Sequence, residues 1–233
     1  PSIRFTWQSL NACTTLNGTN SGCGGDNRFR EFQPAQRGRF FSWLDSTPFF
    51  SGTPLREALG RAGEFLKTDT AWHKTPNGTG NTTANTYACR PSYHVLMTDG
   101  IWNGNNGSPG SDFRHDNRNF KLPDGTDYPG NLRPYADTTS NTLADLAMHY
   151  WATDLRPTLD NKLTPYTPFK SGNSTQDYWN PRNDPANWQH MVNFTMGLGL
   201  TRSLTTAGIQ WQGSTFASAS DGNGFANLQN SIN

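Results

Sequence analysis

The sequence predicts an α/β fold, a mainly parallel sheet with helices on both faces, and three observations lead to this prediction. Segments typical of strands and helices alternate along the chain, in the order strand, helix, strand, helix, strand, helix. The 233 residues contain no internal repeat and no domain linker, which favours a single domain. Only 33% of the residues are hydrophobic, yet 8 Trp and 14 Phe indicate a real core beneath long polar loops.

The first half of the chain opens with a strand and a helix. A half-buried strand near a sheet edge is expected over residues 3–7, where apolar and polar side chains alternate. The aromatic cluster at residues 40–44 predicts a short helix or turn packed on the core. Residues 55–66 carry apolar side chains at helical spacing, and Thr53 and Pro54 suit the N-cap and the first helical position.

The next strand ends in a carboxylate. Residues 95–97 form a short apolar run typical of a buried strand, and Asp99 and Gly100 follow it almost at once. In an open α/β sheet, ligands bind just outside the carboxyl ends of strands, so Asp99 is placed to face a ligand. Asp-Gly pairs also form ordinary turns, and turn statistics alone favour that interpretation.

The second half of the chain contains the clearest helix. It begins at Thr142, which resembles one half of a capping box with Asp145 as the other half, and Pro157 ends it. Another strand is expected over residues 194–200, where apolar side chains alternate with Thr and Gly. A short closing helix is expected over residues 225–232.

Two polar stretches, residues 102–136 and 160–190, are predicted to be long loop insertions within the single domain of residues 1–233. The first insertion contains four aspartates, Asp112, Asp116, Asp124 and Asp127. Their carboxylates are candidate Ca²⁺ ligands, but their spacing does not fit an EF-hand loop. Solvated turn residues are therefore the favoured interpretation of these four side chains.

Charge and cysteine content restrict the partners and the compartment. The 19 basic and 18 acidic residues form no basic stripe, which argues against a nucleic-acid surface. No apolar run is long enough to insert into a membrane. Cys13 and Cys23 lie in a Gly- and Asn-rich loop, so a local disulfide and an oxidising compartment are expected, with a metal site as the competing interpretation. Cys89 is either free or paired outside this chain.

Common catalytic motifs are missing from the sequence. It has no G-x-S-x-G elbow, no Walker P-loop and no H-E-x-x-H helix. His190 is a candidate to support the strand that follows it. Nothing singles out a pair of glycosidase carboxylates, so a secreted carbohydrate-active enzyme using loop acids and aromatic side chains is only a distant alternative.

Two segments, S-G-T-P-L-R-E-A-L and L-M-T-D-G, resemble the second and third metal-binding segments of the von Willebrand factor A domain. The resemblance implies a Rossmann-like fold in which Thr53 and Asp99 help a D-x-S-x-S loop to hold Mg²⁺, or Ca²⁺ or Mn²⁺, with one position open for a carboxylate of the ligand. Hydroxyl and carboxylate oxygens are ligands that suit Mg²⁺.

The sequence departs from this family at one point, because no D-x-S-x-S occurs in the 233 residues. The first strand resembles the second strand of the family. The metal loop and the first helix are therefore expected upstream of Pro1, together with the first strand. Either the chain is an N-terminally truncated domain, or an upstream piece is supplied separately. With Thr53 and Asp99 as the only two ligands, the fragment is expected to bind metal weakly or not at all.

A closer resemblance covers most of the chain. Five segments occur in the order found in the PilY-type tip proteins of bacterial type IV pili: F-F-S-W-L, G-T-P-L-R-E-A-L-G-R-A-G-E-F, C-R-P-S-Y-H-V-L-M-T-D-G-I-W-N-G, T-L-A-D-L-A-M-H-Y-W-A-T-D-L-R-P and D-P-A-N-W-Q-H-M-V-N-F-T-M-G-L-G. The resemblance implies a secreted, non-enzymatic domain at the pilus tip on the cell surface, active in pilus biogenesis, adhesion and surface sensing. Its implied partners are minor pilins and a host or abiotic surface ligand. An adhesion domain of the von Willebrand A type from another secreted protein is the near alternative.

Overall fold

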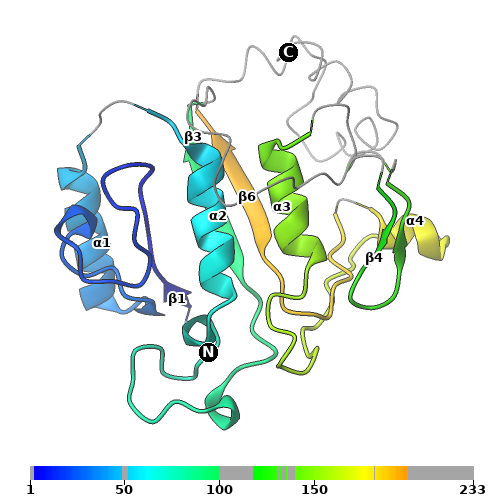
Figure 1. Cartoon of the computed structure of the whole chain (residues 1–233), viewed down its shortest axis with the longest axis horizontal. Coiled ribbons are helices and arrows are strands. Elements are labelled where there is room, and N and C mark those ends of the chain that lie inside the picture. Colours follow the sequence, from blue (N-terminus) through cyan, green and yellow to red (C-terminus); the bar gives the residue numbers. More distant parts are fainter. Residues whose placement is uncertain are drawn as a thin grey trace.

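The computed structural model describes residues 3–48, 52–99, 118–130, 132, 135, 140–180 and 182–198. Helices and strands are mixed along this part of the chain (Figure 1). The strands are β1 (Arg4–Phe5), β2 (Arg30–Glu31), β3 (Tyr93–Thr98), β4 (Phe120–Lys121), β5 (Asp127–Tyr128) and β6 (Val192–Gly197). The helices are α1 (Pro34–Ser46), α2 (Leu55–Leu66), α3 (Leu143–Ala152) and α4 (Ser174–Tyr178), and three short 3₁₀ turns lie at Ser21–Cys23, Asp69–Ala71 and Thr83–Asn85.

The centre of the fold is a parallel pair of strands, β3 and β6. The pairing begins with Tyr93 opposite Val192 and continues over the six residues of each strand. The chain passes from β3 to β6 by way of α3, which is the kind of crossover that parallel neighbours require. The described residues therefore form a small parallel sheet of the kind expected in an α/β fold.

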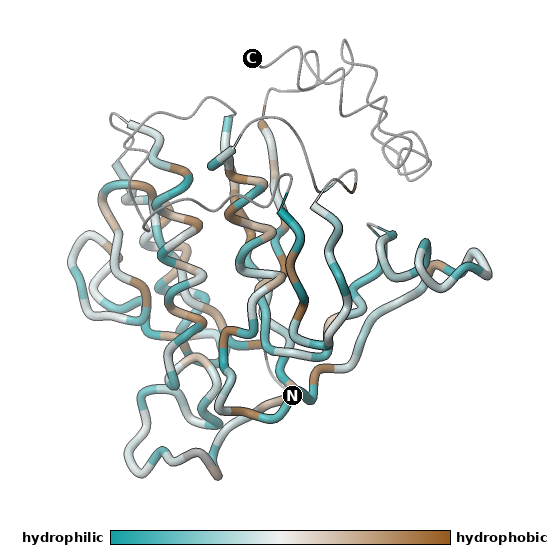
Figure 2. Tube along the Cα trace, turned by 45° about the vertical axis from the view of Figure 1, so that its right-hand side comes forward, coloured by the Kyte–Doolittle hydropathy of each residue, from teal (hydrophilic) through white to brown (hydrophobic). Residues whose placement is uncertain are grey.

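Helices α2 and α3 pack against each other in front of this sheet (Figure 1). Figure 2 shows hydrophobic residues recurring along the helices between hydrophilic ones. At the centre of the contact, Gly63 lies against the ring of Tyr150, where a Cβ atom would come closer than 3.0 Å to the ring. The Tyr150 hydroxyl donates a hydrogen bond to the Glu64 carboxylate (2.9 Å). The buried core around this contact comprises Leu59, Ala62, Leu66, Ala71, Trp72, Leu146, Tyr150, Leu155 and Met191.

Helix α2 begins one residue later than the sequence predicts. Its N-cap residue is Pro54, with φ −78° and ψ 66°, and no side chain caps the helix there. The Leu55 N–H donates to the Thr53 carbonyl (2.8 Å), which closes an inverse γ-turn with Pro54 at its centre. The prediction that Thr53 is the N-cap and Pro54 the first helical residue is therefore wrong, because this turn holds Pro54 outside the helix.

Helix α3 has the predicted capping box. The Thr142 hydroxyl accepts a hydrogen bond from the Asp145 N–H (3.2 Å), and the Asp145 carboxylate accepts one from the Thr142 N–H (2.8 Å). The helix ends at Ala152, earlier than the predicted stop at Pro157. Thr153 is already in an extended conformation (φ −102°, ψ 134°), so the chain leaves the helix before it reaches the proline.

The N-terminal segment forms a small unit of its own beside α2. The predicted strand over residues 3–7 is reduced to β1, which pairs antiparallel with β2 and does not join the parallel sheet. Ile3 is 76% exposed, whereas Trp7 is buried, so the expected apolar face is not continuous. Helix α1 spans 13 residues and is longer than the short element predicted at residues 40–44. Trp7, Cys13, Cys23 and Trp43 form the core of this unit.

The two predicted insertions contain short elements. Strands β4 and β5 form an antiparallel hairpin within residues 102–136, and α4 lies within residues 160–190. Asp124 accepts hydrogen bonds from the Thr126 N–H (2.9 Å) and the Tyr178 hydroxyl (2.6 Å), as expected of a turn residue. The hydrophobic core beside the hairpin contains Leu122, Tyr128, Met148, Ala152, Ala186 and Trp188.

Several predicted features fall outside the described residues. They are Gly100, Asp112, Asp116, the end of the strand at residues 199–200 and the closing helix at residues 225–232. Cys89 lies within the described part of the chain, where it is free and exposed. Among the helices of that part, none combines the length and the apolar character needed to cross a membrane.

Candidate functional site

The candidate site lies where the amino end of α2 meets the carboxyl ends of β3 and β6. Figure 1 shows these three ends at the same end of the sheet. Thr53 is partly buried and directly precedes the turn into α2, whereas Asp99 is exposed and directly follows β3. The elements that carry both predicted residues therefore converge on the edge where α/β sheets usually bind ligands.

Thr53 and Asp99 supply one hydroxyl and one carboxylate to this edge. Both are hard oxygen donors, so they fit a cation such as Mg²⁺ in chemical type. The described residues contain no group of three or more His, Cys, Asp or Glu side chains able to hold a metal ion. The described residues therefore do not assemble a complete metal site from His, Cys, Asp and Glu side chains.

The segment that follows β1 holds the amino end of α2 in place. The Asn11 side-chain amide donates to the Gly52 carbonyl (2.7 Å), directly beside the predicted ligand Thr53. The Gln8 amide donates to the Ala58 carbonyl (2.7 Å). Gln8 in turn accepts a hydrogen bond from the Arg61 guanidinium (2.9 Å). These bonds couple the position of the α2 terminus to the N-terminal unit.

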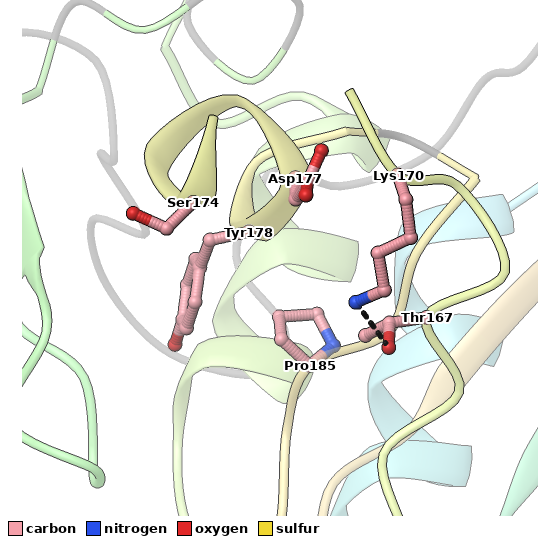
Figure 3. A pocket seen from close by; sticks show the side chains of 6 residues that line it. All are labelled: Thr167, Lys170, Ser174, Asp177, Tyr178 and Pro185. Atoms are coloured by element: carbon pink, nitrogen blue, oxygen red, sulfur yellow. Dashed lines mark hydrogen bonds between the residues drawn. The ribbon is translucent and has the colours of Figure 1, made fainter. Parts of the chain in front are cut away.

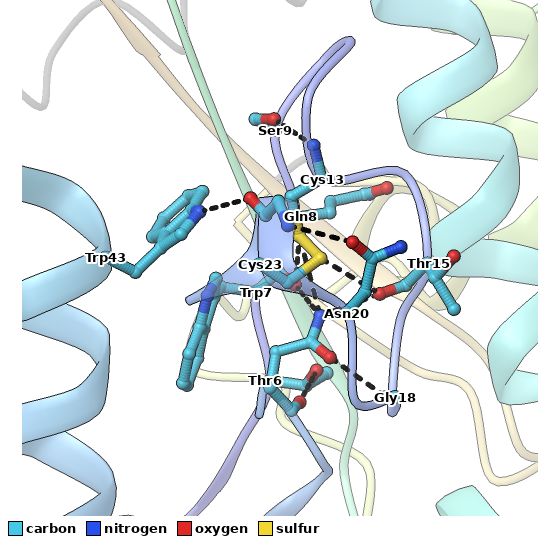
Figure 4. The surroundings of a disulfide bond; sticks show 12 residues. Thr6, Trp7, Gln8, Ser9, Cys13, Thr15, Gly18, Asn20, Cys23 and Trp43 are labelled. Carbon is cyan, nitrogen blue, oxygen red and sulfur yellow. Dashed lines mark hydrogen bonds between the residues drawn. A yellow bond between two sulfur atoms is a disulfide. The ribbon is translucent and has the colours of Figure 1, made fainter. Parts of the chain in front are cut away.

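A disulfide between Cys13 and Cys23 closes the loop of that unit (Figure 4). This is the pairing expected from the sequence, and both cysteines are fully buried. Asn27 is also fully buried, and its side-chain amide donates to the carbonyls of Trp7 and Thr15 (both 2.7 Å). These two hydrogen bonds tie Asn27 both to the segment that follows β1 and to the loop that the disulfide closes.

Sequence analysis singles out His190 as a support for the following strand but misses its partner, Asp184. The His190 Nε2 lies 3.0 Å from the Asp184 carboxylate, and its Nδ1 lies 2.7 Å from the Trp188 carbonyl. The imidazolium form donates from both nitrogens, whereas a neutral ring donates from only one. Trp151 Nε1 donates to the other Asp184 oxygen (3.1 Å). Together these hydrogen bonds hold the chain in place just before β6. No local sequence motif indicates them.

The pKa values of several carboxyl groups are lowered in this fold, among them those of Asp184 and Asp26. Burial raises the pKa of Asp184, but the hydrogen bond and charge of His190 and the bond from Trp151 outweigh burial and leave the pKa below its usual value. At Asp26, the hydrogen bond from Arg28, assisted by the charge of Arg30, lowers the pKa from 3.8 to about 2 despite the opposing effect of burial. Both shifts mean that folding favours the ionised carboxylates.

We expect the free energy of unfolding to decrease as the pH falls from about 4 to about 2. A carboxyl whose pKa is lower in the folded state stabilises the fold above its unfolded pKa, and this contribution is lost as the pH falls through the folded pKa. Urea denaturation at several pH values between 2 and 5 measures the effect. Asp26→Asn should have a shallower acid slope than the unmodified chain, and identical slopes would contradict this assignment.

A pocket of about 220 Å³ opens beside α4 (Figure 3). Its lining residues are Thr167, Lys170, Ser174, Asp177, Tyr178 and Pro185. The Lys170 ammonium donates to the Thr167 hydroxyl (3.1 Å), and the Tyr178 hydroxyl donates to the Asp124 carboxylate (2.6 Å). These side chains are already hydrogen-bonded within the fold. We therefore keep the end of the sheet, and not this pocket, as the candidate site.

Comparison with known proteins shows that the chain is similar to part of a type IV pilus biogenesis factor. The chain is 50% identical over 217 residues to the type IV pilus biogenesis factor PilY1 of Pseudomonas aeruginosa strain UCBPP-PA14, which covers 92% of this chain and 18% of that protein. It is 47% identical over 219 residues to PilY1 of strain PAK, which covers 94% of this chain and again 18% of the relative. The chain thus spans less than a fifth of the length of these relatives. No protein-family model and no solved structure matches it.

Proposed function

We propose that the chain is a von Willebrand A-like domain of a type IV pilus tip protein, and that it acts in pilus biogenesis, adhesion to surfaces and surface sensing without catalysing a reaction. The observation that carries the proposal is the 50% identity with the pilus biogenesis factor PilY1 over 217 residues. The parallel pair β3–β6 and its crossover through α3 are compatible with the α/β architecture of such a domain.

The proposed location is the cell surface, at the tip of the pilus. The buried disulfide between Cys13 and Cys23 supports a location outside the reducing cytosol, since disulfides persist in oxidising compartments. The proposed partners are minor pilins on the side of the fibre and a host or abiotic ligand on the outer side. The PilY1 relatives, described as pilus biogenesis factors, support pilus components as the first class of partner.

The proposed contact with the surface ligand depends on a divalent cation. Thr53 and Asp99 would hold Mg²⁺, Ca²⁺ or Mn²⁺ together with a D-x-S-x-S loop from sequence before Pro1. When bound, the ion would supply a coordination position for a carboxylate of the ligand. The role of the chain would be to hold the Thr53 hydroxyl at the start of α2 and the Asp99 carboxylate at the end of β3. The hydrogen bonds from Asn11 to Gly52 and from Gln8 to Ala58 support the first of these two positions.

Deletion of residues 1–233 from the longer polypeptide tests the general proposal. We expect cells carrying the deletion to display fewer surface pili and to attach less to a solid surface. Pilus number is measured by electron microscopy and attachment by a static adhesion assay. If both quantities are unchanged, the proposed function is wrong.

Substitutions at the two ligands test the metal site separately. In a polypeptide extended upstream, Thr53→Ala and Asp99→Ala should each weaken Mg²⁺ binding by about tenfold or more, since even loss of a residue that only supports a metal ligand costs 10–100-fold. Isothermal titration calorimetry with Mg²⁺, Ca²⁺ and Mn²⁺ measures this change. Asp127→Ala is the matched control, because Asp127 is an exposed carboxylate whose ion-pair partner is Lys121 of the β4–β5 hairpin. Equal affinity in all variants would refute the assignment.

A further inference from the structure

Three basic side chains gather around one tyrosine near the amino end of β3. The Arg90 guanidinium lies 4.7 Å from the centroid of the Tyr87 ring, the Arg4 guanidinium 5.5 Å and the Lys74 ammonium 5.9 Å. Arg90 precedes the first residue of β3, so the group lies at the opposite end of this strand from Asp99. We call Arg4, Lys74, Tyr87 and Arg90 the basic cluster.

Backbone carbonyl groups hold the two guanidinium groups of the basic cluster in place. Arg90 donates hydrogen bonds to the carbonyls of Ala71 (2.8 Å) and His73 (3.1 Å). Arg4 donates one to the Lys74 carbonyl. The fold thus assembles the cluster from separate stretches of the chain, and no run of basic residues in the sequence indicates it.

Within the described residues, no carboxylate forms an ion pair with any of these three cations. Glu31 is opposite Arg4 in the register of β1 and β2, but the Arg4 guanidinium contacts the Lys74 carbonyl and the Tyr87 ring instead. Like charges repel, and charges that are partly removed from water are ordinarily paired. Three cations held together without an acidic partner therefore indicate a place for an anion.

The electrostatics at Arg90 agree with this interpretation. Burial and, to a smaller extent, the positive charge of Arg4 lower the pKa of the Arg90 guanidinium to about 10. Both effects disfavour the charged form of Arg90 in the folded chain. An anion bound beside the guanidinium would act in the opposite direction and favour the charged form.

Several hydrogen-bond donors of the basic cluster are left for a ligand. Within the described part of the chain, the exposed Lys74 ammonium and the Tyr87 hydroxyl have no hydrogen-bond partner. A guanidinium offers five N–H groups, and the bonds to backbone carbonyls leave some of those on Arg4 and Arg90 unused. The cluster thus combines positive charge with N–H and O–H donors, which is the complement of an anionic group with several oxygen atoms.

We propose that the basic cluster binds a phosphate group, either as a monoester on a sugar or as the free ion. A phosphate group carries nearly two negative charges and three strong acceptor oxygens, so it matches three cations better than a carboxylate does. The Arg90 guanidinium lies over the Tyr87 ring, so recognition depends on charge and hydrogen bonds and not on stacking of the ligand on that face. The proposal does not depend on the function proposed above.

Acetylation of Lys74 measures whether the basic cluster is occupied. A bound anion covers the ammonium and favours its charged form, and both effects slow acylation of the amine. The longer polypeptide is acetylated at pH 8 in increasing concentrations of inorganic phosphate, with sodium chloride keeping the ionic strength constant. Mass spectrometry follows each lysine separately. Lys170 is the internal control, because it is exposed and bonds to Thr167 outside the cluster.

We expect saturating phosphate to slow acetylation of Lys74 by about threefold or more and to leave Lys170 unchanged. Arg4→Gln and Tyr87→Leu should each raise the phosphate concentration for half-maximal protection by about fivefold, the upper end for an exposed charge pair. Arg37→Gln removes the same charge from an exposed position on α1 and should leave that concentration unchanged. Protection in the unmodified protein tests the proposal even if a variant fails to fold.

Unchanged acetylation of Lys74 in phosphate would overturn the proposal. Equal protection by acetate at the same ionic strength would also overturn it, as would an equal effect of Arg37→Gln, because either result indicates only general screening of charge. Lys74 that reacts slowly without phosphate in the longer polypeptide, but rapidly in the chain of residues 1–233, would show that another segment occupies the cluster, which contradicts the proposal.

A second titration distinguishes the two sources of the phosphate group. Protection by glucose 6-phosphate at concentrations similar to those of inorganic phosphate would support a group carried on a sugar. Protection by inorganic phosphate alone would support the free ion. Neither result depends on pilus number or on a divalent cation, so failure here is distinguishable from failure of the proposed function.

Discussion

Replacement of Gly63 by alanine is expected to lower the free energy of unfolding by about 3 kcal/mol, at the upper end of the usual cost of overpacking a core. Gly63 lies in α2 against the fully buried ring of Tyr150 from α3, and an added Cβ would come closer than 3.0 Å to that ring. The ring cannot move away freely, because its hydroxyl is bonded to Glu64 and to the Gly60 carbonyl. The methyl group must therefore push α2 and α3 apart. Urea denaturation measures the loss.

Gly38→Ala is the matched control for this prediction. Gly38 lies within α1, and a Cβ at this position would have no neighbour within 4 Å. Alanine is favoured over glycine inside a helix, so Gly38→Ala should raise the free energy of unfolding by about 0.5–1 kcal/mol. If Gly63→Ala lowers the free energy of unfolding and Gly38→Ala raises it, the contact with Tyr150, and not helix propensity, is the reason for glycine at position 63. A stabilising Gly63→Ala change would contradict the packing described for α2 and α3.

Removal of the disulfide by the double substitution Cys13→Ala and Cys23→Ala is expected to cost about 2–4 kcal/mol, the usual range for a native disulfide. The bridge closes a loop between residues separated by 10 positions, and loss of this constraint favours the unfolded chain. Because the segment beside the loop also holds α2, we further expect faster hydrogen exchange at the first turn of α2 in the double variant.

Cys89→Ser controls for the loss of cysteine itself. Cys89 is exposed and free, so its substitution should change the free energy of unfolding by less than about 0.5 kcal/mol. Both variants are compared with the unmodified chain by urea denaturation without reductant. If the double alanine variant unfolds at the same urea concentration as Cys89→Ser, the bridge does not stabilise the fold as the structure indicates.

The sequence predicts best those elements whose signals lie within a few residues. The two residues of the capping box, Thr142 and Asp145, lie three positions apart in the sequence, and the structure contains both of its hydrogen bonds. The start of α2 is different, because Pro54 is held in a turn beside Gly52, which accepts its hydrogen bond from a residue 41 positions away. Local cap preferences do not include such a long-range contact, so the boundary is displaced by one residue.

Long-range pairing explains the other differences. β1 and β2 have only two residues each, too few for alternation to reveal whether the pair is parallel or antiparallel. The contact between Gly63 and Tyr150 joins residues far apart in the sequence, and the residues near either one do not predict it. At the candidate site, Thr53 and Asp99 are predicted as ligands through a resemblance, and this stays a prediction. The sequence places them beside α2 and β3, but their spacing carries no information about ligands contributed by other segments.

The direction of the strands also determines how the sheet responds to a mechanical load. β3 and β6 run the same way, so a pull between the start of β3 and the end of β6 loads the hydrogen bonds of the ladder together, in shear. The β4–β5 hairpin runs antiparallel, so a pull on its two free ends separates its two residue pairs one after the other. If the chain carries tension at the end of a fibre, the parallel pair is the part of the described fold best arranged to resist it.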